Sequence, residues 1–144
     1  MNNPIIIHTD GGARGNPGPA AVGVYMEQDG KVLHKFGKQI GDTTNNVAEY
    51  TAVIEALRYL TMRGVDEQGT MIQFFLDSKL VVEQLNGNYK IKDAKLRELS
   101  LNVRMLEQDI VNAGRGLGIA ITYTYTPREQ NKEADLLVNQ ALDG

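Results

Sequence analysis

The chain has 144 residues, no cysteine and a net charge of −3, and 42% of its residues are hydrophobic. These values predict a single domain, residues 1–144, with a sizeable core, and they argue against disulfides, a thiolate metal site and nucleic-acid binding by net charge alone. The sequence also has no basic leader and no long apolar stretch, so we expect a cytoplasmic protein with no membrane partner.

The first half of the chain predicts three strands followed by a helix. Residues 4–10 form an apolar run typical of a buried strand, and a turn-rich connection follows. Residues 21–28 and 31–40 are predicted to pair as a hairpin around Asp29-Gly30. Residues 45–63 carry apolar side chains at helical spacing, and Gly64 is a stop signal.

The second half alternates between strands and helices. We expect strands at 71–77 and 119–125, and helices at 79–86, 94–112 and 132–142. The element order is therefore βββαβααβα. Tight turns favour antiparallel pairing of the first three strands, and helical connections favour parallel pairing of the later ones. The predicted fold class is α/β, with a mixed five-stranded sheet flanked by helices.

Four acids stand where a carboxylate is costly to bury: Asp10, Glu49, Asp77 and Asp135. Asp10 and Asp77 follow apolar runs, and ligands gather beyond the carboxyl ends of parallel strands. Glu49 lies on the apolar face of its helix, and Asp135 lies beside the apolar stripe of the last one. Carboxylates gathered without cysteine or a suitable histidine predict Mg²⁺, with Mn²⁺ as an alternative, rather than zinc.

Each acid also has a structural interpretation. Asp10 would be a turn residue, and Glu49 would complete a capping box with Asn46. Asp77 would cap the following helix, and Asp135 would complement a helix dipole. The functional interpretation depends on the set, because two strand ends and two helix starts can converge at one edge of a sheet.

Four short motifs resemble those of ribonuclease H type 1. They are Thr9-Asp10-Gly11-Gly12 with Asn16-Pro17-Gly18-Pro19, Thr43-Thr44-Asn45-Asn46 with Glu49, Leu76-Asp77-Ser78, and Asn131-Lys132-Glu133-Ala134-Asp135. They occur in the order of that family, and the resemblance covers nearly the whole chain. It implies the ribonuclease H-like fold and an endonuclease that cuts the RNA strand of an RNA–DNA hybrid.

The resemblance also implies residue roles. Asp10, Glu49, Asp77 and Asp135 would hold two divalent ions, and hydrolysis would leave 5′-phosphate and 3′-hydroxyl ends. Asn16, Asn45 and Asn46 match positions that touch the minor groove of the hybrid, and Thr44 matches one near a phosphate. Asn suits this task because it both donates to and accepts from a 2′-hydroxyl.

The chain departs from the family at several positions. Many members have a histidine in the loop before the last aspartate, where this chain has Arg128 and Glu129 as candidate substitutes. Its two histidines, His8 and His34, lie in predicted strands and are interpreted as structural. Lys79 replaces a residue that is uncharged in many members.

The segment from 79 to 104 holds six basic residues against three acids, although it lacks the longer basic, Trp-containing handle of some members. Lys79, Lys90 and Lys92 are therefore candidate substrate-binding residues, and a solvated helical face is the alternative. We expect a monomer that binds RNA–DNA hybrid. Two other functions remain open: a non-catalytic module that binds hybrid or RNA, and a nuclease that also acts on duplex RNA.

Overall fold

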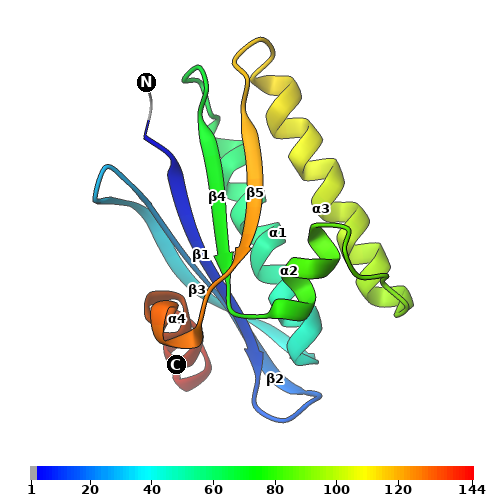
Figure 1. Cartoon of the computed structure of the whole chain (residues 1–144). Helices are drawn as coiled ribbons and strands as arrows, with labels where there is room; N and C mark the ends of the chain where they lie inside the picture. The colour runs from blue at the N-terminus through cyan, green and yellow to red at the C-terminus, as the bar shows by residue number, and fades with distance from the viewer. Residues whose placement is uncertain (1–2) are drawn as a thin grey trace.

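The structure is a computed structural model that describes residues 3–144 (Figure 1). Within these residues one sheet has the strand order β3-β2-β1-β4-β5. The strands are β1 (Ile5–Ala13), β2 (Gly18–Gln28), β3 (Lys31–Thr43), β4 (Met71–Leu76) and β5 (Ala120–Tyr125). The helices are α1 (Asn45–Arg63), α2 (Lys79–Leu85), α3 (Ala94–Ala113) and α4 (Lys132–Asp143), with a 3₁₀ turn, η1 (Arg128–Gln130), before α4.

The pairing of the strands confirms the predicted mixed sheet. β2 lies antiparallel to β1 and to β3, whereas β4 lies parallel to β1 and to β5. Three boundaries differ most, because β1, β2 and β3 each extend three residues further toward the loops at this end of the sheet than predicted. In particular, β1 continues past Asp10, which pairs with Gly23 of β2. The parallel pairing of β1 with β4 ends at Thr9 and Leu76, so Asp10 and Asp77 each directly follow its last pair.

The helices cover the two faces of the sheet unequally. α1, α2 and α3 lie on one side of it and α4 on the other, near the strands β1 to β3 (Figure 1). Glycines let α4 approach closely, since a Cβ atom at Gly23 would lie 2.3 Å from the carbonyl oxygen of Ala134. The core lies mainly between the sheet and α1, where Tyr50, Leu57 and Leu60 are fully buried.

The helix starts decide two of the structural interpretations of the acids. Thr44 caps α1 by accepting a hydrogen bond from the backbone N–H of Val47, so the capping box expected at Asn46 does not form. Ser78, not Asp77, caps α2. None of the helices within residues 3–144 is long and apolar enough to cross a membrane.

Candidate active site

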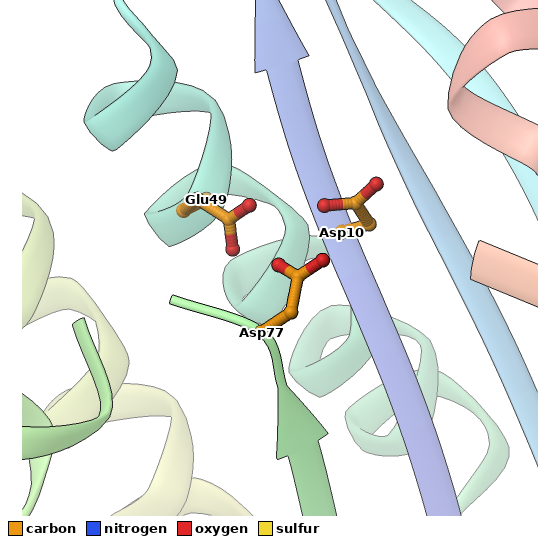
Figure 2. Close-up of side chains that lie close together, drawn as sticks. All are labelled: Asp10, Glu49 and Asp77. Carbon is orange, nitrogen blue, oxygen red and sulfur yellow. The ribbon is translucent and has the colours of Figure 1, made fainter. Parts of the chain in front are cut away.

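Three of the four predicted acids converge at the end of the parallel pairing. Asp10 comes from β1, Glu49 from α1, and Asp77 follows β4. Each offers a carboxylate oxygen within 4.8 Å of those of the other two. Figure 2 shows the three side chains pointing toward one another from their separate elements. The strand ends and the helix therefore place three of the four acids predicted to converge around one point.

The close approach of α1 to β1 brings Glu49 into this group. A Cβ atom at Gly11 would lie 2.2 Å from the backbone of Ala48, so only glycine leaves room for the helix here. The backbone N–H of Gly11 donates to Oε1 of Glu49 at 3.2 Å. Gly11 thus leaves room for α1 beside β1 and orients the Glu49 carboxylate by a hydrogen bond.

Asp135 lines the same cleft but does not belong to the close group of three. It lies in the first turn of α4, where a negative charge also complements the helix dipole. Its Oδ1 lies 3.6 Å from Nη2 of the exposed Arg128. After burial and the charge of Asp77, the negative charge of Asp135 also raises the pKa of Asp10.

The clustered acids disturb one another's protonation. Burial and the negative charge of Asp77 raise the pKa of Asp10 to about 7. Burial and the charge of Asp10 raise the pKa of Glu49 well above its ordinary value. Burial also raises the pKa of Asp77, although the nearby Arg128 partly opposes this effect. Such a cluster is stable in its ionised form only when positive charge is brought to it.

One carboxylate oxygen in the cluster has no partner. Oε2 of Glu49 is buried and accepts no hydrogen bond within the described residues, a state it shares there only with Oγ1 of Thr9. A buried polar atom without a partner is costly, so it marks a place for a ligand or water. Hard carboxylate oxygens, three of them close together, are the donor set that Mg²⁺ and Mn²⁺ prefer. The residues therefore fit a divalent cation.

The acids line a cleft of about 510 Å³ that also includes Asn45 and Asn46. Asn16 lies beside the first of these, because its Oδ1 accepts from the backbone N–H of Asn45 at 2.9 Å. Oδ1 of Asn45 in turn accepts from the backbone N–H of Ala13 at 2.8 Å. The structure thus brings the predicted asparagines together at the start of α1, next to the cap residue Thr44.

The remaining predicted residues lie outside the cleft, apart from Arg128, which lines it. Lys79 begins α2, and Lys90 and Lys92 lie between α2 and α3; all three are exposed and form no ion pair in the described part of the chain. Glu129 is exposed in η1 and does not line the cleft. These lysines are free to meet an external anion.

Sequence reasoning missed three residues at the site. Arg14 and Tyr125 line the cleft, and the buried Asn131 contacts the backbone beside Asp10. Arg14 had no signal beyond its glycine-rich surroundings, and Tyr125, which is 48% exposed, was expected only as part of the strand at 119–125. Asn131 belongs to the fourth family motif, but its sequence position indicates only a helix start.

Buried acids that converge beside the parallel strands of a mixed sheet define a candidate divalent-cation site in an α/β protein. The family model for RNase H matches residues 2–143. The chain therefore belongs to the RNase H family, and its resemblance to the type 1 members is confirmed by the relatives below.

Individual relatives support this assignment. The chain is 40% identical over 135 residues to ribonuclease HI of Halobacterium salinarum, covering 93% of this chain and 62% of that protein. It is 38% identical over 141 residues to the bifunctional protein Rv2228c of Mycobacterium tuberculosis, covering 96% of this chain. The chain spans only 35% of the length of that mycobacterial protein.

A solved structure gives a similar result. The crystal structure of LC11-RNase H1 in complex with an RNA/DNA hybrid is 43% identical, with a TM-score of 0.85 and 96% of each chain covered. The predicted ribonuclease H-like fold is thereby confirmed.

Proposed function

We propose that this chain is a ribonuclease H, an endonuclease that hydrolyses the RNA strand of RNA–DNA hybrids with the help of two divalent ions, Mg²⁺ or Mn²⁺. The observation that carries the proposal is the group formed by Asp10, Glu49 and Asp77, with one buried Glu49 oxygen left unpartnered. A module that only binds nucleic acid has no need of such a costly cluster. The hybrid bound by the related LC11-RNase H1 supports the choice of substrate.

In this proposal Asp10, Glu49, Asp77 and Asp135 hold the ions and are the catalytic carboxylates. Ions held there would supply the chemistry of the reaction, which is to lower the pKa of the attacking water and to stabilise the leaving 3′ oxygen. The protein contributes fixed geometry. The N–H of Gly11 binds Oε1 of Glu49, while Oε2 has no hydrogen-bond partner among the described residues and would be available to an ion. Asp10 and Asp77 stand on the ends of paired strands, so their separation is set by the sheet.

The asparagines are suited to bind the minor groove of the hybrid without preference for its base sequence. Oδ1 of Asn16 and Oδ1 of Asn45 are both occupied by backbone N–H groups, whereas their Nδ2 groups form no hydrogen bond within residues 3–144. These asparagines therefore present donors. The minor groove offers acceptors at every base pair, so donors bind there with little sequence preference. Asn46 and Thr44 complete this surface, and a 2′-hydroxyl would identify the RNA strand.

Arg128 is the better placed of the two candidates for the position of the missing loop histidine. It lines the cleft, lies 3.6 Å from Asp135 and lowers the pKa of Asp77, whereas Glu129 does not line the cleft. A guanidinium there is suited to hold a phosphate by paired N–H donors. We assign Arg128 an accessory role in phosphate binding. Lys79, Lys90 and Lys92 would bind the backbone further from the cut.

The deciding experiment compares three substrates of one sequence: RNA–DNA hybrid, duplex RNA and duplex DNA. Each is incubated with Mg²⁺, Mn²⁺ or EDTA, and the ends of the products are mapped. We expect cuts in the RNA strand of the hybrid, with 5′-phosphate ends, and none in EDTA. Additional cutting of duplex RNA would widen the substrate range. Cleavage in EDTA, or equal cleavage of duplex DNA, would refute the proposal, and hybrid binding without cleavage would favour the binding module.

A further inference from the structure

Asn131 occupies the cap position of α4 but does not cap the helix. Asparagine is among the preferred capping residues, yet the side chain of Asn131 forms no capping hydrogen bond. The residue is only 1% exposed, so its amide must be satisfied elsewhere. Its hydrogen bonds run instead toward the sheet, to residues more than 120 positions earlier in the chain.

The orientation of this amide is fixed by its partners. Nδ2 of Asn131 donates to the carbonyl oxygen of Thr9 at 2.9 Å, and a carbonyl can only accept. Oδ1 of Asn131 therefore faces the other way, where it lies 2.9 Å from Nδ1 of His8. Because an amide oxygen can only accept, Nδ1 of His8 must carry the proton and donate it. The ring of His8 is held in place by stacking on Phe75, with the centroids 5.3 Å apart.

Asn131 is linked to three of the four acids proposed to hold the ions. The Thr9 carbonyl that it binds immediately precedes Asp10. Its own backbone carbonyl accepts from the N–H of Asp135 at 3.1 Å. A hydrogen bond from its side-chain amide also favours the ionised form of Asp77 and lowers the pKa of that group. Outer partners of this kind orient the residues that hold a metal.

We propose that His8 is a positioning residue for the cation site: its Nδ1–H donates to Oδ1 of Asn131, so that the amide nitrogen remains directed at the Thr9 carbonyl, next to Asp10. The inference rests on the proposed metal-dependent function and revises the interpretation of His8 as a purely structural residue. His34 supplies the contrast. It also lies on a strand and stacks on an aromatic ring, that of Tyr59 at 3.9 Å, but it lies in β3, at the far edge of the sheet.

Two substitutions separate the N–H group of His8 from its ring. His8→Phe keeps a ring to stack on Phe75 and removes the donor, whereas His8→Asn keeps an N–H at the same distance along the side chain and removes the ring. Mn²⁺ affinity of the substrate-free protein is measured by calorimetry, with thermal unfolding as the check on folding. We expect His8→Phe to weaken Mn²⁺ binding about fivefold, the equivalent of one net hydrogen bond. His8→Asn should bind within about twofold of the wild type, and His34→Phe should not change the affinity.

A second measurement does not depend on any variant folding. The ¹⁵N shifts of the His8 ring in the wild type, at a pH where the ring is neutral, should show the proton on Nδ1. A proton on Nε2 would overturn the inference, as would His8→Phe binding Mn²⁺ like the wild type while His8→Asn binds worse. Asp10→Asn tests the cation site separately from the role of His8. If it leaves Mn²⁺ binding intact, the proposed cation site itself fails, and the role of His8 fails with it.

Discussion

A buried and a half-buried glutamate show opposite ways of placing an acid in this protein. Glu107 of α3 accepts hydrogen bonds from Nη1 of Arg104 at 2.9 and 3.0 Å and from the hydroxyl of Tyr123 at 2.6 Å. Glu49 of α1 accepts from one backbone N–H and has two further acids beside it instead of a base. The charge of Glu107 is thus met within the chain. The charge of Glu49 has no cationic partner in the described chain and would be balanced only by a bound cation.

This contrast separates stability from function. A carboxylate that is paired and hydrogen-bonded stabilises the fold, and removing its partner lowers stability because an unpaired charge is left partly buried. A carboxylate placed among like charges opposes folding until a cation arrives. If the comparison holds, substitutions at the two sites should have opposite signatures in activity and in stability.

The largest effect is expected at the cation site. Asp10→Asn and Asp77→Asn should each lower the rate of hybrid cleavage by more than about 100-fold, because even outer partners of metal ligands cost up to about that much. The melting temperature without metal should stay the same or rise, since one of several repelling charges is gone. Cleavage rates and thermal unfolding in EDTA measure both quantities. A clear loss of stability in EDTA would make these acids structural.

The next effect concerns pH. The pKa of Asp10 is raised from 3.8 to about 7, so between these values the folded metal-free protein binds more protons than the unfolded chain. Its free energy of unfolding should therefore fall as the pH rises from about 4 to about 7, and the raised pKa of Glu49 acts in the same direction. The fall should amount to a few kcal/mol, at about 1.4 kcal/mol per pKa unit.

Urea unfolding in EDTA across this pH range measures that dependence. Asp10→Asn should flatten the profile, and saturating Mg²⁺ should stabilise the wild type more at pH 8 than at pH 5. If the free energy of unfolding of the wild type does not change between pH 5 and 7, the pKa of Asp10 is not raised in the folded metal-free protein, and the prediction is wrong.

The paired glutamate should behave in the opposite way. Glu107→Gln removes the charge that Arg104 and Tyr123 share, and should cost about 1–3 kcal/mol of stability. The rate of hybrid cleavage by the folded protein should not change, because Glu107 does not line the cleft. Chemical unfolding and single-turnover cleavage give the two numbers. A loss of cleavage without a loss of stability would break the distinction between the two glutamates.

The sequence predicted the elements well because periodicity reports burial. It placed Glu49 on the apolar face of α1, where its side chain is indeed buried. It ended β1 three residues early, because Gly11, Gly12 and Ala13 carry little side-chain signal although they pair with β2. The assignment of Asp10 and Asp77 to one place needed only the rule for parallel strands.

Other features depend on contacts that no local pattern records. The hydrogen bond between His8 and Asn131 joins residues 123 positions apart. The close approach of α4 depends on Gly23 and Gly37, which read in sequence only as weak points within strands. The roles of individual site residues, the cytoplasmic location and the monomeric state remain predictions.

The smallest effect extends the comparison to charges on the surface. Lys90 and Lys92 resemble Glu49 in that neither has an ion-pair partner in the described residues, so we expect their partner to be the phosphate backbone of the substrate. Replacing both with alanine should make the negative slope of log K against log salt shallower by about 1.4–1.8, since each lost phosphate contact removes about 0.7–0.9 from its magnitude. The measurement is hybrid binding in Ca²⁺ at several salt concentrations.

A matched control changes the net charge by the same amount elsewhere. Lys31→Ala with Lys35→Ala removes two charges from β3, at the far edge of the sheet, and should leave the slope unchanged. Equal slopes for both pairs of substitutions would mean that residues 90–92 are only a solvated surface, and that the chain meets the substrate through its cleft alone.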